Sequence, residues 1–578
     1  MLFKLMKSVR QYWLAALLSP LFMVGEVYME VRIPGIISRI VDYGITPGNI
    51  TVVWQQGLML VVTALCSLVF GVGSAVFAAY GATGFSRNLR HDMYYRVQSF
   101  DFGNIDKFST ASIITRLTSD VANIQMCFQM MIRMAVRCPM MVVLASLNVY
   151  KISPKLCLVY VVALPLMALG LLVLTRLVFP IFERGFKTID RLNNVVQENL
   201  HGIRVVKSFV RQDKEQEKFT DVSGKLYKDF SRAERIMAFN SPLMQTAVYA
   251  CIITISYLGA NMIVSSGNTT FTTGMLTSMF TYTTQILSGL MMLSMVFVML
   301  TMSRAPMQRC CELLAEQPEL HNPENPVMEV ADGSLDFENV SFRYSKKAGK
   351  DALQNVNIHI NSGMTVGIIG GTGSSKSTFV QLIPRLYDAT EGTVRVGGVP
   401  VEQYDLKVLR DQVAMVLQKN VLFSGTIKDN LRWGDPNATD EEMEHACKLA
   451  CAHDFIMSFP DGYDTHIEQG GKNVSGGQKQ RLCIARALLK KPKILILDDS
   501  TSAVDTHTDA MIRKAFAEEI PGTTKLIIAQ RVASVQEADL ILVMDGGQVV
   551  AQGNHETLLK TSQIYREVYE SQVKGGEE

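Results

Sequence analysis

The sequence predicts a chain of two domains, an all-α domain of six transmembrane helices followed by an α/β domain that has a phosphate-binding loop and a helical subdomain. Long apolar runs dominate up to about residue 305, whereas charges, glycines and prolines recur regularly beyond about residue 334. A glycine-rich loop directly follows a short apolar strand in the second part. Because 578 residues exceed the size of one domain, we expect a membrane domain over 1–305, a linker over 306–333 and an α/β domain over 334–578.

Six apolar stretches in the first domain are long enough to cross a membrane. A hydrocarbon core roughly 30 Å thick requires about 20 helical residues. The first stretch is too long for a cleaved signal peptide, and five similar stretches follow it. The six stretches are 13–41, 56–84, 126–150, 155–180, 240–266 and 273–303.

Basic residues between the apolar stretches predict the orientation of the chain. The loops 44–53 and 265–274 carry no charge, and only Lys151 and Lys155 mark the third loop on that side. The positive-inside rule therefore places the N-terminus and the α/β domain in the cytosol, in a multi-pass protein of the cell membrane surrounded by lipid. The basic side carries Lys4, Lys7 and Arg10 and the segments 85–125 and 183–235.

Two features of the membrane stretches admit both a structural and a functional interpretation. Glu26 and Glu30 share a helix face, as do Arg133 and Arg137. Charges at this depth either pair between helices, which we favour, or form a surface that binds cationic substrate. Methionines in the last stretch could form a flexible binding surface, or they could simply face lipid. They are Met275, Met279, Met291, Met292, Met295, Met299 and Met302.

Composition argues against two other classes of protein. A net charge of +2 gives no indication of nucleic-acid binding. The ten cysteines are scattered without CxxC spacing, which argues against a zinc site or a disulfide framework. We interpret them as reduced thiols, in keeping with a soluble part that faces the cytosol.

The loop after the strand 365–369 is typical of a phosphate-binding loop. The pattern GxxxxGK[ST] is met except at Ser375, where glycine is expected. Backbone N–H groups of such a loop surround phosphates at a helix N-terminus, Lys376 adds charge at the β- and γ-phosphates, and the Ser377 hydroxyl ligates Mg²⁺. The loop reads Gly370, Gly371, Thr372, Gly373, Ser374, Ser375, Lys376, Ser377 and Thr378.

Two further motifs accompany the loop. The apolar strand 493–497 ends in Asp498, the form of a Walker B element, and this carboxylate is expected to hold Mg²⁺ through water. Between loop and strand lies a VSGGQ segment at the start of a predicted helix, whose hydroxyl and N–H groups can face a γ-phosphate. Its residues after Val474 are Ser475, Gly476, Gly477 and Gln478.

The order of these motifs resembles that of ATP-binding cassette (ABC) ATPases, and six helices followed by one such domain resemble the exporter branch. The resemblance covers nearly the whole chain and implies ATP and Mg²⁺ as ligands. It implies that Tyr344 stacks on adenine, that Gln418 joins Ser377 and Asp498 around Mg²⁺, and that Ser502–Asp505 is the D-loop. It also implies coupling helices near 101–110 and 204–216.

Two catalytic positions depart from the family pattern. Asp499 stands where active members have glutamate, and Gln530 stands where they have histidine. The shorter Asp499 withdraws its carboxylate by roughly 1 Å, enough to cost about 10²-fold in rate. Drift or a weakly active homodimer is one interpretation of these changes. Because the signature is intact, we favour a heterodimer with a second half-transporter that completes one competent site with Ser475–Gln478.

The pattern is similar to that of bacterial heterodimeric multidrug exporters, which implies a translocase for small hydrophobic or amphipathic compounds. Two alternatives remain open at this point. One is a lipid or peptide exporter, and the other is an ATP-binding regulatory subunit that transports nothing itself. The full set of predicted helices and coupling segments argues against the regulatory subunit.

Overall fold

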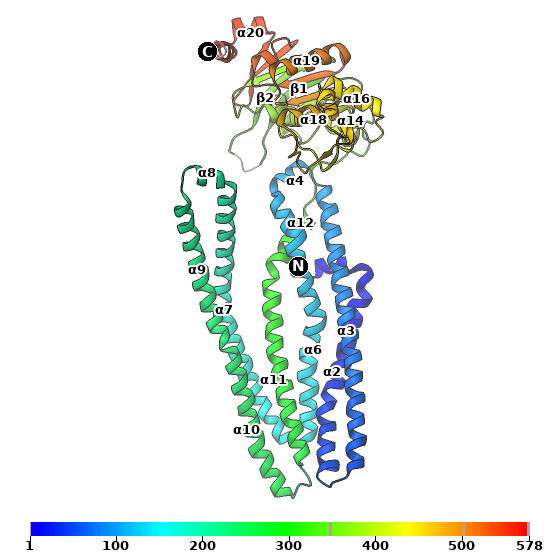
Figure 1. The fold of residues 1–578 in the computed structure, drawn as a ribbon, viewed down its shortest axis with the longest axis vertical. Coiled ribbons are helices and arrows are strands. Elements are labelled where there is room, and N and C mark those ends of the chain that lie inside the picture. Colours follow the sequence, from blue (N-terminus) through cyan, green and yellow to red (C-terminus); the bar gives the residue numbers. More distant parts are fainter. Residues whose placement is uncertain (1, 346–348, 501–502, 575–578) are drawn as a thin grey trace. The chain divides into compact units, whose positions relative to one another are not determined.

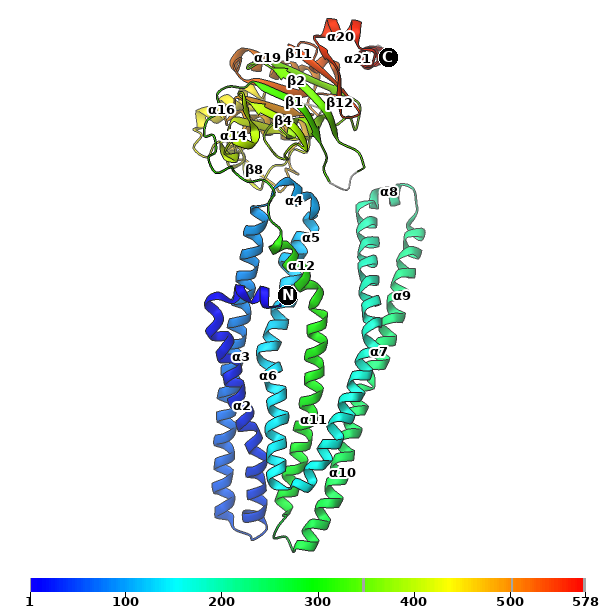
Figure 2. The same ribbon diagram turned by 180° about the vertical axis from the view of Figure 1, so that it is seen from behind.

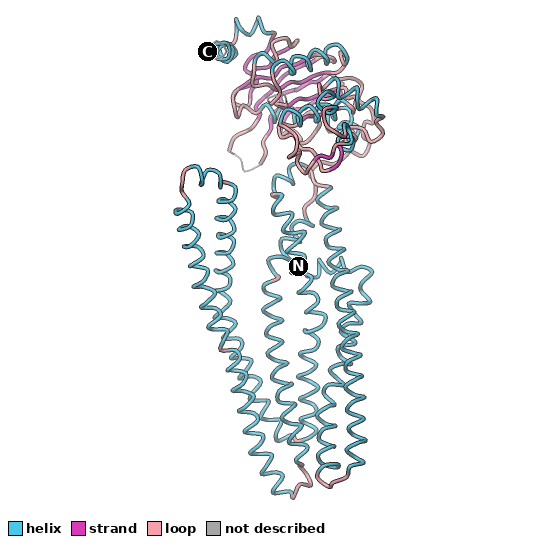
Figure 3. The backbone as a smooth tube through the Cα atoms, in the orientation of Figure 1, coloured by secondary structure: helices cyan, strands magenta, loops and turns pink. Residues whose placement is uncertain are grey.

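The computed structural model describes residues 2–345, 349–500 and 503–574. These residues form two compact units, which differ in their secondary structure (Figure 3). The helical unit consists of the chain up to Gln98 together with Ser109–Glu316. The α/β unit consists of Ser99–Phe108 and the chain from Gln317 onwards, so a short segment from the first half of the sequence packs with the second unit.

Six helical stretches in the helical unit are long and apolar enough to cross a membrane, as predicted. Several run far beyond membrane thickness: the 49 residues of α3 span about 73 Å at 1.5 Å per residue. The elements are α1 (Leu2–Leu5), η1 (Met6–Tyr12), α2 (Trp13–Ile40), η2 (Val41–Ile45), α3 (Ile50–Gln98), α5 (Thr110–Thr115), η3 (Arg116–Asp120), α6 (Val121–Ile152), α7 (Pro154–His201), α8 (Ile203–Ser208), α9 (Gln212–Ala238), α10 (Asn240–Ser266), α11 (Thr273–Met302) and α12 (Arg304–Ala315).

Helices α2, α3, α6 and α11 lie side by side, whereas α7 and the α9–α10 arm diverge from them toward α8 (Figures 1 and 2). Near the opposite end, α7, α10 and α11 share a buried apolar cluster with α2 and α6. Two tyrosines cross-link this cluster. Tyr160 is hydrogen-bonded to the Thr283 hydroxyl at 2.6 Å, and Tyr282 donates to the Val31 carbonyl at 3.0 Å.

A carboxylate of η2, which continues α2, binds the start of α11 at the end of the bundle where α10 turns into α11. Asp42 accepts from the Gly274 backbone N–H at 2.9 Å and from the Thr272 hydroxyl at 2.6 Å. The contact depends on glycine, because a Cβ at Gly274 would lie 2.4 Å from the Ser38 carbonyl oxygen and 2.6 Å from Asp42. A charged acceptor at the start of α11 also interacts favourably with the helix dipole.

The α/β unit contains a six-stranded sheet of order β12-β11-β3-β10-β9-β6, an antiparallel sheet of order β2-β1-β4-β5 and a small β7-β8 pair. One apolar cluster lies between the two larger sheets, and a second lies under the helical subdomain. The strands are β1 (Leu335–Phe342), β2 (Leu353–Ile360), β3 (Thr365–Gly370), β4 (Glu391–Val396), β5 (Val399–Pro400), β6 (Val413–Val416), β7 (Gly425–Thr426), β8 (His466–Ile467), β9 (Ile494–Asp498), β10 (Thr524–Ile528), β11 (Leu540–Asp545) and β12 (Gln548–Gly553).

The parallel strands β3, β10, β9 and β6 end at one edge of the large sheet. In register, Ile528 of β10 pairs with Ile368 of β3 and with Asp498 of β9. Loops that follow neighbouring parallel strands meet at that edge, where ligands of such sheets bind. The helices are α4 (Phe102–Lys107), α13 (Lys376–Gln381), η4 (Val401–Gln403), α14 (Leu406–Gln412), α15 (Ile427–Leu431), α16 (Asp440–Leu449), α17 (His453–Met457), η5 (Gly462–Asp464), α18 (Gly476–Leu488), α19 (Thr506–Glu519), η6 (Val532–Ser534), α20 (His555–Thr561) and α21 (Gln563–Lys574).

Candidate functional site

The predicted phosphate-binding loop lies between β3 and α13, at the carboxyl edge of the large sheet. Lys376 Nζ donates to the carbonyls of Gly370 at 2.7 Å and Gly371 at 2.9 Å, so the ammonium lies across the loop. A Cβ at Gly371 or Gly373 would meet nothing within 4 Å, which leaves the space beside the loop open. Burial lowers the pKa of Lys376, while Asp499 and Asp498 oppose this effect. An anionic phosphate would add to the groups that favour the charged ammonium.

Ser375, the departure from the loop pattern, occupies a backbone conformation that favours glycine. Its φ of 71° and ψ of 24° lie in the left-handed region, and it precedes the first residue of α13. A non-glycine residue there costs of order 1 kcal/mol. The loop therefore keeps the shape that the glycine pattern requires, at the expense of local strain.

Two oxygen ligands suited to Mg²⁺ meet beside the loop. Ser377 Oγ donates to Asp498 Oδ1 at 3.0 Å, across the ends of α13 and β9. Asp498 is only 3% exposed, and burial raises its pKa. A hydroxyl and a carboxylate are hard oxygen donors of the kind Mg²⁺ prefers. Gln418 follows β6 at the same edge and is exposed. These residues fit the ion, which when bound neutralises charge on the transferred phosphate.

The tyrosine predicted to stack on adenine stands beside the first turns of α13. The Tyr344 hydroxyl lies 2.9 Å from the Thr378 hydroxyl, and the ring is 51% exposed. Tyr387 packs edge-on against it, with ring centroids 5.3 Å apart. The exposed ring leaves apolar surface on which a planar base can stack.

Tyr387 also connects this part of the site with α4, a link that no sequence pattern singled out. Its hydroxyl donates to Asp106 Oδ2 at 2.7 Å, and its ring lies edge-on to Phe102. Short helices occupy both predicted coupling segments, α4 in the first and α8 in the second. The role of Tyr387 as a contact becomes visible only in the tertiary structure.

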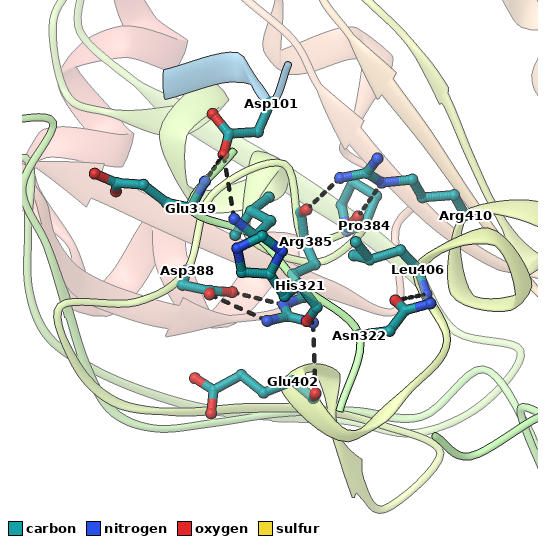
Figure 4. Close-up of polar contacts among 11 residues, drawn as sticks. Asp101, Glu319, His321, Asn322, Pro384, Arg385, Asp388, Glu402, Leu406 and Arg410 are labelled. Carbon is teal, nitrogen blue, oxygen red and sulfur yellow. Dashed lines mark hydrogen bonds and ion pairs between the residues drawn. The ribbon is translucent and has the colours of Figure 1, made fainter. Parts of the chain in front are cut away.

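Further hydrogen bonds fasten α4 and the adjoining linker within the α/β unit (Figure 4). Asp101 caps α4 and also accepts from the backbone N–H groups of Glu319 at 2.6 Å and Leu320 at 3.2 Å. Arg385 is 5% exposed and donates to the carbonyl of His321 in the linker at 3.2 Å. Together these contacts hold the segment 101–107 against the domain that carries the nucleotide motifs.

The side chains at the two catalytic positions that depart from the family pattern are hydrogen-bonded to each other. Gln530 Nε2 donates to Asp499 Oδ2 at 2.7 Å. Asp499 has a φ of 49°, and its N–H donates to the Ile528 carbonyl at 3.1 Å. The residue as a whole is only 9% exposed. The amide therefore occupies a carboxylate oxygen that an attacking water would need as its hydrogen-bond acceptor.

The VSGGQ segment begins α18 with a complete capping box. Ser475 Oγ accepts from the Gln478 backbone N–H at 3.3 Å, and Gln478 Oε1 accepts from the Ser475 N–H at 2.9 Å. Ser475 and Gly476 are exposed. A Cβ at Gly477 would lie 2.8 Å from the Ala503 carbonyl oxygen, so glycine is needed there. Ala503 and Asp505 of the predicted D-loop are described, whereas Ser502 lies outside the described residues.

The charged residues of the membrane stretches pair unevenly. Arg137 binds both carboxylates, contacting Glu26 closely through NH1 and Glu30 Oε2 at 2.7 Å through NH2. Within the described residues, Nε of Arg133 is buried without a hydrogen-bond partner. The expected pairing between α2 and α6 therefore rests on one arginine rather than two, because Arg137 alone reaches both glutamates.

Known proteins match the chain along nearly its whole length. The family model "ABC transporter transmembrane region" matches residues 17–302, and the model "ABC transporter" matches residues 353–502. The ABC transporter ATP-binding protein YfiB of Bacillus subtilis is 35% identical over 569 residues, 98% of each chain. YknU of the same organism is 33% identical over 487 residues, 84% of this chain and 83% of its own.

A solved structure has the same fold. The structure of a bacterial Atm1-family ABC exporter with ATP bound superposes with a TM-score of 0.82 at 23% identity, over 98% of both chains.

Proposed function

Because the chain belongs to the ABC transporter family, we propose that it forms one half of a heterodimeric exporter of hydrophobic or amphipathic compounds. The chain is an ATP-driven multi-pass transporter with the exporter fold. In the proposal, its own loop retains Mg²⁺–ATP but hydrolyses it slowly. Its signature segment completes the competent site of the partner.

The hydrogen bond between Gln530 and Asp499 is the observation that carries this proposal. The carboxylate that should position water is short, largely buried and already occupied by the neighbouring amide. The residues proposed to bind ATP support this, since Lys376 and the Ser377–Asp498 pair flank an open loop. Retention of ATP with slow hydrolysis follows from intact binding groups beside an impaired general base.

The signature supports the complementary half of the proposal. Ser475 and Gly476 are exposed at the start of α18, where a helix N-terminus favours an anion. The γ-phosphate held by a partner would meet the Ser475 hydroxyl and the following N–H groups. The partner would supply the glutamate and histidine that this chain lacks.

Exposed apolar side chains at the tip of the α7–α9 arm support assembly with a second subunit. Val205 is 59% exposed, Phe209 72% and Val210 77%. Clustered apolar side chains at a helical tip mark a surface that another protein covers. We propose that the partner's ATP-binding domain packs against this surface. The tip of the arm then lies on the cytosolic side of the cell membrane.

The substrate class rests on the membrane stretches. Arg137 pairs with both Glu26 and Glu30, so neither carboxylate is left without a cationic partner inside the helical unit. Met292 and Met295 are exposed on α11, where flexible thioethers suit varied apolar ligands. Lipids and peptides are the alternative substrates, and each is tested separately in the ATPase measurements below.

ATPase measurements test the proposal directly. The chain purified alone should hydrolyse ATP slowly, and activity should rise when a half-transporter with the glutamate and histidine is co-expressed. Lys376→Ala provides the control for nucleotide binding at this chain's loop. Stimulation of the pair by amphipathic compounds, lipids or peptides then identifies the cargo. Robust turnover by this chain alone would refute the heterodimer.

A further inference from the structure

The last helix of the chain binds the loop that carries Gln530. Gln572, near the end of α21, donates from Nε2 to the Gln530 carbonyl at 2.8 Å. The same carboxamide accepts through Oε1 from the Val532 backbone N–H, also at 2.8 Å. One side chain thus holds the backbone on both sides of Arg531, as a residue of a parallel neighbouring strand would.

We call the two hydrogen bonds from Gln572 to the loop the clamp. Helix α21, which carries Gln572, is itself packed firmly against the rest of the α/β unit. Tyr565 is fully buried, and its hydroxyl lies 2.7 Å from His555 Nδ1. Val568 and Tyr569 pack against the buried apolar cluster that also contains Val532. Because the helix and the loop share this cluster, Gln572 is held at a defined distance from the loop.

The clamped loop leads directly to the catalytic edge. It connects the end of β10 at Ile528 with η6, and Gln530 reaches Asp499 from its middle. With the backbone fixed at 530 and 532, the Gln530 amide has few positions other than the one beside Asp499. Without the clamp, the loop could move away from the edge at which the phosphate loop lies.

We propose that Gln572 is a positioning residue for Gln530, and that the C-terminal helix thereby controls how long nucleotide remains at this chain's phosphate loop. The inference rests on the proposed function, since it assumes that the loop binds ATP. It assigns a control element in the C-terminal helix, outside the nucleotide motifs.

Release of a fluorescent ATP analogue from the full chain in lipid nanodiscs tests the proposal. Gln572→Met keeps the length of the side chain and removes both hydrogen bonds, so release should quicken by about three- to ten-fold. Gln563→Met is the matched control on the same helix, because Gln563 Nε2 donates to Glu567 at 2.8 Å. The control should release at the wild-type rate, and neither variant should lower the unfolding temperature by more than about 4 °C.

Two additional variants separate positioning from a general loss of structure. Gln572→Glu keeps an acceptor for Val532 but cannot donate to Gln530 while ionised, so it should also quicken release. Combining Gln572→Met with Gln530→Ala should add nothing to Gln530→Ala alone if the clamp acts through that side chain. The proposal would be overturned if the effects of the two substitutions on the release rate were fully additive.

The remaining outcomes distinguish this proposal from the one on which it rests. If the wild-type chain retains nucleotide and Gln572→Met releases it no faster than Gln563→Met, the clamp is refuted and the proposed function stands. If the wild-type chain binds no nucleotide and Lys376→Ala changes nothing, both proposals are overturned.

Discussion

Removing Arg137 should destabilise the helical unit, because it leaves two carboxylates inside the membrane stretches without their shared cation. The side chains of Arg137, Glu26 and Glu30 are 21%, 14% and 30% exposed, so the pairs are mostly buried. Breaking a fully buried pair costs about 3–5 kcal/mol. Partial exposure reduces this to about 2–3 kcal/mol for Arg137→Met, and at about 2 °C per kcal/mol in a large unit the Tm should fall by about 4–6 °C.

Arg133→Met is the matched control, with the same change one helical turn away on α6. Nε of Arg133 has no hydrogen-bond partner within the described residues, so its loss should lower the Tm far less. Replacing Glu26 and Glu30 by glutamine in the Arg137→Met background should restore most of the stability, because no unpaired charge then remains.

Thermal unfolding in detergent, followed by tryptophan fluorescence with and without a transported compound, measures the effect. The reasoning predicts a loss of Tm that is independent of the compound. It would be refuted if Arg133→Met destabilised the chain as much as Arg137→Met. It would also be refuted if Arg137→Met or Glu26→Gln left the Tm unchanged and selectively abolished transport of cations.

Three other perturbations have defined outcomes. In the paired complex, Asp499→Asn should change ATPase activity less than about three-fold, whereas Ser475→Arg should nearly abolish it; equal losses would reverse the assignment of the two sites. Ser375→Gly should raise the Tm of the ATP-binding domain by about 1–3 °C, because glycine relieves the left-handed strain; an unchanged or lower Tm in calorimetry would contradict this. Gly274→Ala should break the Asp42 contact and lower the Tm, but Thr272→Val should do so less, since Asp42 still accepts from the Gly274 N–H and the Ser38 hydroxyl.

The sequence by itself determined the fold class, because periodicity and composition act locally. Apolar runs of membrane length have no stable alternative in water, and six of them predicted the helical stretches that the structure contains. The phosphate-binding loop, Asp498 and the VSGGQ segment were also visible, since each depends on residues adjacent in the chain. Even the strained Ser375 was recognisable as a departure from a glycine pattern.

Only the tertiary structure decided which distant residues meet. Either arginine of α6 had the right spacing to face Glu26 and Glu30, and packing of α6 against α2 selected Arg137. The contacts of Gln572 with the Gln530 loop join residues 40 or more positions apart through one exposed carboxamide, which has no sequence signature. Such pairings depend on the relative placement of whole helices and strands, which a pattern confined to one segment does not encode.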